Sequence, residues 1–167
     1  MSLTIEQFGT ECHTILSKGS SDENLEAVRS TLERFLADEE FVDTHLGPDN
    51  TEKRTILFED PELDFCICAH VYLGSASAPP HDHGPTWAIY GQASGQTVMT
   101  EFKALQAPDG DTPGKVEVVK TYDLDPGMAV AYPTGRLHSP KREGDTRLIR
   151  IEGRNLDLVS REAFELA

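Results

Sequence analysis

The spacing of apolar residues at the start of the chain predicts amphipathic helices. Residues 4–7 form a capping box that opens the first helix, and Gly19 ends it. The polar run over residues 20–23 starts a second helix, and a short third helix is predicted over residues 39–46, before the Gly-Pro stop at 47–48. The apolar stripes comprise Ile5, Phe8, Cys12, Ile15 and Leu16 in the first helix, and Leu25, Val28, Leu32, Phe35 and Leu36 in the second.

From about Thr51 the apolar pattern changes to a period of two, which is typical of strands. On the longest predicted strand, residues 63–73, the apolar set alternates with Cys66, Cys68, His70 and Tyr72. Many short strands separated by turn residues indicate a closed or sandwiched all-β fold, with the two helices covering its outside. The predicted strands are 55–58, 63–73, 87–90, 96–105, 115–122, 128–132, 136–139 and 146–151, and the tail 155–167 is expected to be a helical turn or coil.

Length and charge narrow the possibilities further. The chain of 167 residues fits a single domain, 1–167, with a helical cap over 1–47 and a β region over 51–155. A formal net charge of −14 disfavours nucleic acid and anionic membranes as partners. The chain has no apolar run of membrane-spanning length and no signal peptide, and its three cysteines follow no disulfide framework. We therefore expect a cytoplasmic protein.

Candidate metal ligands lie in the stretch 74–95. His81 and His83 are two residues apart, and in a strand they would project to the same face. Neutral imidazole is a common ligand of iron, zinc, nickel and copper. A pair of this kind is weak evidence alone, and His138, at the end of the glycine- and proline-containing stretch 127–138, strengthens it.

A second candidate set is Cys66, Cys68 and His70. Three ligands on one straight strand are spread over too great a length to converge easily on one ion, at about 3.3 Å per residue. We therefore interpret them as small buried cysteines beside a hydrogen-bonded histidine, facing the core or the interior.

The two glycine- and histidine-containing stretches resemble a known family. Residues 74–95 are similar to the first cupin motif, and residues 127–138 are similar to the second. The resemblance implies a cupin double-stranded β-helix, a jelly-roll barrel with N-terminal α-helices, that brings the three histidines together. Ala88 stands where the first motif usually carries a glutamate ligand. A cupin with three histidines and no glutamate resembles the cysteine dioxygenase group, the thiol dioxygenases, which hold ferrous iron by three histidines.

The resemblance also suggests substrate-binding residues. Arg54 is close to the position at which thiol dioxygenases carry an arginine for the substrate carboxylate, while the alternative is a solvated arginine in a charged run. Tyr90 shares a strand face with Ala88 and is therefore a pocket candidate. The serine-histidine-tyrosine series of those enzymes has no counterpart here. Arg150 and Glu152 share a face in that region and could form an interior ion pair, replace the missing proton relay, or form an exposed salt bridge.

These observations favour a metal-dependent cupin, namely an Fe(II) dioxygenase of the thiol dioxygenase type that uses dioxygen and a small thiol carboxylate. Its metal ligands would be His81, His83 and His138, and Arg54 and Tyr90 would bind substrate. Two alternatives remain: a cupin metalloenzyme of other chemistry, such as dicarbonyl cleavage or isomerisation, and a non-catalytic metal- or ligand-binding cupin. Ferrous iron is the expected metal, although nickel, zinc or copper can occupy a histidine site in purified protein. Cupins are often dimers, so a homodimer is also considered.

Overall fold

The computed structural model describes residues 2–167 and contains three helices before the strands. The helices are α1 (Ile5–Leu16), α2 (Asp22–Leu36) and α3 (Glu39–Leu46), as the apolar spacing predicted. The capping box at Thr4 and Gln7 is confirmed, since Gln7 N donates to Thr4 Oγ1 and Thr4 N donates to Gln7 Oε1. None of the helices within residues 2–167 has the length and apolar character to cross a bilayer.

Ten strands and one short 3₁₀ helix follow, and eight of the strands were predicted. The strands are β1 (Arg54–Glu59), β2 (Cys66–Tyr72), β3 (Ala76–Ser77), β4 (Ala88–Ser94), β5 (Thr97–Gln106), β6 (Gly114–Leu124), β7 (Ala129–Tyr132), β8 (Leu137–Arg142), β9 (Thr146–Glu152) and β10 (Phe164–Leu166). Two of them were missed, because β3 and β10 are only two and three residues long. The tail contains the expected helical turn, η1 (Leu156–Leu158), and then β10, which pairs parallel with β6.

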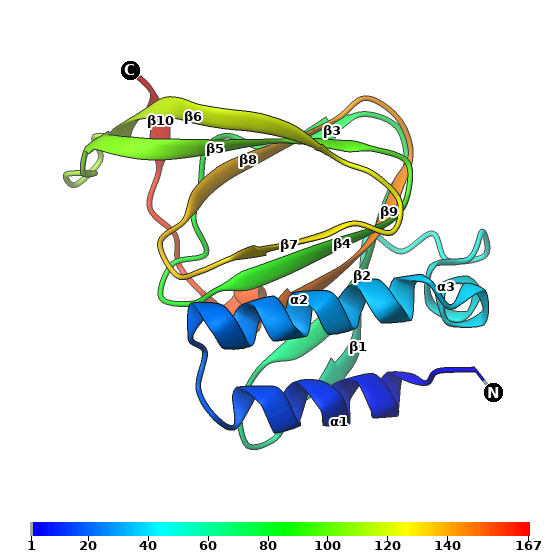
Figure 1. Ribbon diagram of the computed structural model, residues 1–167. Coiled ribbons are helices and arrows are strands. Elements are labelled where there is room, and N and C mark those ends of the chain that lie inside the picture. Colours follow the sequence, from blue (N-terminus) through cyan, green and yellow to red (C-terminus); the bar gives the residue numbers. More distant parts are fainter. Residues whose placement is uncertain (1) are drawn as a thin grey trace.

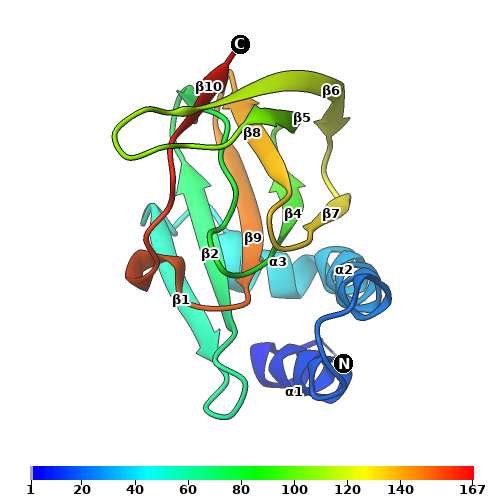
Figure 2. The same cartoon turned by 90° about the vertical axis from the view of Figure 1, so that its left-hand side faces the viewer.

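The strands form two facing sheets. The first has the order β1-β2-β9-β4-β7 and the second the order β10-β6-β5-β8-β3. Figure 1 shows the second sheet stacked over the first, with α1 and α2 beneath the first, and Figure 2 shows the same layers from the side. A strand-rich fold with N-terminal helices is therefore confirmed, in an arrangement consistent with a jelly roll. The ladders make two sheets and not one closed ring, so β1, β7, β10 and β3 remain edge strands.

The helices cover the outer face of the first sheet and make the main apolar core. Phe8 of α1 stacks on Phe35 of α2 with ring centres 4.4 Å apart. Gly91 lets α2 approach β4 closely, because an added Cβ there would lie 2.6 Å from the Leu32 side chain. The outward residues of β2, which are Ile67, Ala69 and Val71, belong to the same core together with Phe65 just before the strand, as the alternation predicted.

The opposite face of the first sheet points toward the second sheet, and this space is called the interior below. Tyr90 and Tyr132 of the first sheet pack there against Met99 and Leu124 of the second. Strand register places Tyr90 beside Arg150, which in turn lies beside Cys68. The interior of this fold is therefore rich in polar and charged groups, and these are the groups available for binding.

The segment around the histidine pair is a connection between strands. His81 makes only an isolated bridge with His138, and residues 82–87 form a turn before β4 begins at Ala88. The pair therefore does not lie in a regular strand, because Gly84 with φ 63° and Pro85 turn the chain there.

Candidate metal centre

The three histidines singled out in the sequence meet in the structure. His81 and His83 come from the β3–β4 connection and His138 from β8, and their ligand atoms all lie within 4.8 Å of one another. The His83 and His138 Nε2 atoms are 3.0 Å apart. Two backbone hydrogen bonds hold the β3–β4 connection to β8: His81 N donates to His138 O at 3.0 Å, and His138 N donates to His81 O at 2.9 Å.

Hydrogen bonds at the Nδ1 atoms of His81 and His138 fix the tautomer that metal binding through Nε2 requires. His81 Nδ1 lies 2.8 Å from the Pro79 carbonyl oxygen, and His138 Nδ1 lies 2.9 Å from that of Arg136. A carbonyl oxygen only accepts, so each Nδ1 carries the proton and each Nε2 presents a lone pair. His83 Nδ1 is buried without a partner. Three histidine nitrogens therefore converge, and the residues fit a divalent ion with preference for imidazole ligands.

Burial keeps the three rings neutral. It lowers the pKa of His81 and of His83, and it lowers the pKa of His138 to about 3. The neighbouring positive charge of Arg150 acts in the same direction on all three. Because the neutral ring is the form that binds a metal, the surroundings favour the metal-binding state.

Tyr90 and Tyr132 contact the histidine rings, and Ala88 lies on the strand of Tyr90. The Tyr90 hydroxyl lies 3.3 Å from His83 Nε2, and burial raises its pKa, so that it stays protonated near neutral pH. Ala88 is fully buried on the same strand face and offers no ligand. The Tyr132 ring stacks on the His138 ring with centres 3.9 Å apart and planes 7° from parallel, which fixes the ring orientation.

Arg54 lies on the inner face and is bound by a carboxylate. It is opposite His70 in the β1–β2 register, and its side chain is 16% exposed. Arg54 Nη1 and Nη2 donate to the two oxygens of Glu152, at 2.7 and 2.9 Å, and Nη2 also donates to Asn155 Oδ1. Arg150 Nε donates to Glu152 at 2.6 Å. Arg150 and Glu152 thus form an interior ion pair, and Arg54 belongs to the same network.

A second group of ligand types, Cys66, Cys68 and Glu152, is also buried within 4.8 Å. The two sulfur atoms are 3.7 Å apart, and the hydrogen bond with Cys68, together with burial, raises the pKa of the Cys66 thiol. A metal needs the thiolate form, and the Glu152 oxygens are already engaged by two arginines. The group is therefore better explained as small buried cysteines beside an ion pair.

Sequence reasoning missed Arg142 and Arg161. Arg142 is 4% exposed at the end of β8. The period of two along this strand could have revealed it, because His138, Pro140 and Arg142 share the inward face. Arg161 lies in the C-terminal tail, and its charge lowers the pKa of the three ligand histidines. The tail reaches the site because residues 159–161 pack against Gly84, a long-range contact that local pattern does not reveal.

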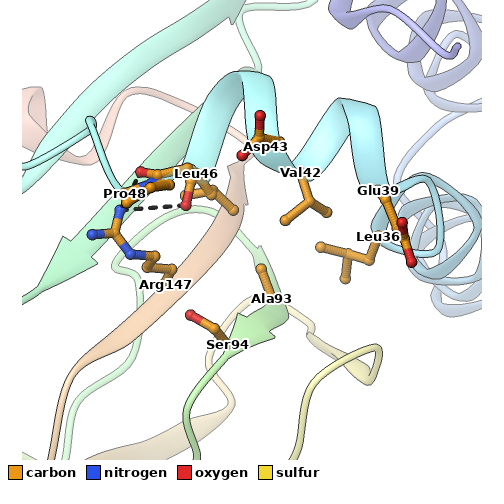
Figure 3. A pocket seen from close by; sticks show the side chains of 10 residues that line it. Leu36, Glu39, Val42, Asp43, Leu46, Pro48, Ala93, Ser94 and Arg147 are labelled. Carbon is orange, nitrogen blue, oxygen red and sulfur yellow. Dashed lines mark hydrogen bonds between the residues drawn. The ribbon is translucent and has the colours of Figure 1, made fainter.

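A surface pocket of about 630 Å³ lies elsewhere, between α3 and the ends of β4 and β9 (Figure 3). Its Arg147 donates to the carbonyl oxygens of Leu46, Gly47 and Asn50. These are the carbonyl groups at and just beyond the end of α3, so this cation caps a helix. The pocket therefore does not compete with the histidine centre as a candidate active site.

Comparison with known proteins finds distant structural likenesses. No protein-family model matches the chain, and no characterised protein matches it by sequence. Structural neighbours include a cupin superfamily protein from Desulfitobacterium hafniense with 15% identity and a TM-score of 0.45, covering 61% of this chain and 76% of that chain. A cupin-2 domain containing protein from Shewanella frigidimarina has 17% identity and a TM-score of 0.47, covering 68% and 92%. KdgF from Halomonas sp. has 20% identity and a TM-score of 0.46, covering 66% and 91%. Likenesses this distant describe the chain path and assign no activity.

Proposed function

We propose that the protein is a metal-dependent cupin enzyme, an Fe(II) dioxygenase of the thiol dioxygenase type that acts on a small thiol carboxylate. The observation that carries the proposal is the set of three neutral histidines, His81, His83 and His138, with no acidic ligand at Ala88. Three neutral ligands leave the charge of a divalent metal uncancelled and leave coordination positions for small molecules. Ferrous iron bound there would supply the redox chemistry with dioxygen.

The surrounding side chains have orienting roles in this proposal. Tyr90 is held next to His83 and stays protonated, so its hydroxyl can donate a hydrogen bond or a proton to a bound substrate. The Arg150 guanidinium lies 5.8 Å from the Tyr90 ring and keeps the region positive. Together they offer a donor and a positive charge where the related enzymes use a serine-histidine-tyrosine series.

Arg54 and Tyr90 are the proposed substrate-binding residues. Arg54 could accept a substrate carboxylate only by exchanging it for Glu152, which occupies both of its Nη atoms. A buried charge that loses its partner costs about 3 to 5 kcal/mol. Direct binding by Arg54 therefore requires that Glu152 remain held by Arg150 during the exchange.

The binding of both Arg54 Nη atoms by Glu152 favours a second candidate function. This candidate is a cupin metalloenzyme of other chemistry, such as cleavage of a dicarbonyl or an isomerisation. Its substrate would bind the metal through two oxygens and would need no exchange at Arg54. The arginine-rich interior favours an anionic substrate in this case as well.

Oxygen uptake tests the proposal. Protein loaded anaerobically with ferrous iron is mixed with cysteine, 3-mercaptopropionate and other small thiol acids, and iron binding is measured in parallel. We expect iron-dependent uptake with at least one thiol, which His138→Ala abolishes together with iron binding. Iron binding without uptake on any thiol would reject the thiol dioxygenase proposal, and the second candidate would then be tested with dicarbonyl substrates.

A further inference from the structure

Arg142 is a buried arginine without an acidic partner. It ends β8 on the same inward face as His138 and is 4% exposed. Its guanidinium carbon lies 4.4 Å from the centre of the Tyr72 ring, and its Nε has no hydrogen-bond partner. Within residues 2–167 no carboxylate forms an ion pair with it, and the groups that act on its charge are Tyr72, Tyr90 and Arg150.

The other two interior arginines are both paired. Arg54 binds Glu152 and lies 3.0 Å from an Asp157 oxygen, and Arg150 binds Glu152. Two carboxylates therefore serve two of the three guanidinium groups, and Arg142 is left as an uncompensated positive charge. An isolated charge is strongly unfavourable in a protein interior, and it is tolerated best when a ligand supplies the counter-charge.

Tyr90 contacts the histidine centre and lies close enough to Arg142 for the positive charge of Arg142 to act on it. Its hydroxyl lies 3.3 Å from His83 Nε2, and the Arg150 guanidinium lies over the same ring at 5.8 Å. Arg142 also borders a surface pocket of about 420 Å³ together with Ser75.

We propose that Arg142 binds the carboxylate of the ligand that occupies the histidine centre. The proposal rests on the proposed function, because it takes the ligand to be the substrate at His81, His83 and His138. The planar guanidinium fork matches a carboxylate through two parallel hydrogen bonds, and stacking on Tyr72 orients the fork without using its N–H groups. Arg54 can then keep its structural bond to Glu152 throughout.

Binding measured without turnover tests this assignment. Affinities of 3-mercaptopropionate and of its uncharged amide are measured by calorimetry on the zinc-loaded and metal-free full chain, for the wild type, Arg142→Met and Lys141→Met. Lys141 is the matched control, because it precedes Arg142, carries the same charge and has a side chain 67% exposed. We expect Arg142→Met to bind the acid about 30-fold or more weakly. We also expect unchanged affinity for the amide and no effect of Lys141→Met.

Two further readouts separate the outcomes. Arg142→Met should be at least as heat-stable as the wild type without ligand, since it removes an unpaired buried charge, whereas a merely structural arginine would leave a less stable chain. Arg142→Lys keeps the charge and loses the guanidinium fork, so it should bind the acid with an intermediate affinity. This variant replaces Arg142→Met in the test if Arg142→Met does not fold. Equal affinity for the acid in the wild type and the Arg142 variants would overturn the proposal, whatever the oxygen uptake shows. Equal affinity for the acid with and without zinc would also overturn the proposal, because it would show that Arg142 binds an anion that does not contact the metal.

Discussion

Arg54 and Glu152 form a two-point ion pair between β1 and β9, with nitrogen–oxygen distances of 2.7 and 2.9 Å. Glu152 is fully buried, and it also accepts from Arg150 and from the backbone N–H of Leu156. One carboxylate thus holds two arginines and the turn after β9 together. This network forms one wall of the interior, and a substrate carboxylate could bind both Nη atoms of Arg54 only by exchanging with Glu152.

Replacing Glu152 by glutamine should destabilise the protein strongly. The substitution keeps the shape of the side chain but leaves Arg54 and Arg150 without their shared negative charge. We expect a loss of about 3 kcal/mol in the free energy of unfolding, measured by urea denaturation. Glu143→Gln is the control, because its side chain is 82% exposed and should change stability by no more than about 0.5 kcal/mol.

The stability should fall as the pH drops below about 6.5. Burial, followed by the charge of Arg150, lowers the pKa of His70 from 6.5 to about 2, so between these values only the unfolded chain takes up this proton. Each such group removes about 1.4 kcal/mol per pH unit once the pH is well below 6.5. In metal-free protein, His70→Gln should therefore flatten the slope of unfolding free energy between pH 6 and 5 by about that amount. An unchanged slope would show that His70 does not titrate in this way.

Glu152 should add a second acid transition. Its pKa is lowered from 4.5 to about 2 against the effect of burial, chiefly by the Arg54 hydrogen bonds and by the charge of Arg150. Its stabilising contribution is therefore complete above about pH 4.5 and is lost as the pH falls toward 2. As the pH falls through this range, the free energies of unfolding of the wild type and of Glu152→Gln should converge. Curves that stay parallel would contradict the assigned pKa direction.

Metal binding should depend on each of the three histidines. We expect His83→Ala to lose most of its bound metal and the rise in melting temperature that a divalent metal gives the wild type. His45→Ala is the control, because His45 lies at the end of α3, outside the histidine group. If His83→Ala keeps its full metal content in elemental analysis, the three histidines are not the metal-binding site.

Tyr90→Phe should separate metal binding from turnover. The variant keeps the ring beside His83 and loses only the hydroxyl at 3.3 Å from Nε2. If the hydroxyl donates to bound substrate, kcat should fall by about 100-fold while the metal content stays unchanged. Tyr72→Phe is the control, since it removes an interior hydroxyl and keeps the ring that lies under Arg142. An unchanged kcat in Tyr90→Phe would show that the hydroxyl has no part in the reaction.

Local sequence determined the elements and most of the ligands. The capping residues and helical spacing placed the three helices, and the period of two assigned the outward and inward faces of β2 correctly. The resemblance of residues 74–95 and 127–138 to the two cupin motifs was enough to single out His81, His83 and His138, which the fold brings together. The helix stripes and strand faces depend on residues close together in the chain, where backbone geometry alone decides which side chains share a face. His138 lies 55 residues after His83, and only the fold brings it to the histidine pair.

Only the tertiary structure decided how the charged residues pair. Glu152 lies far from Arg54 in the chain, and the sheet brings it to the same wall, where the two opposite charges form an ion pair. The same packing leaves Arg142 buried without a carboxylate and brings Arg161 of the tail toward the histidines. Pairing of this kind depends on distance and desolvation across several strands, which no local pattern encodes.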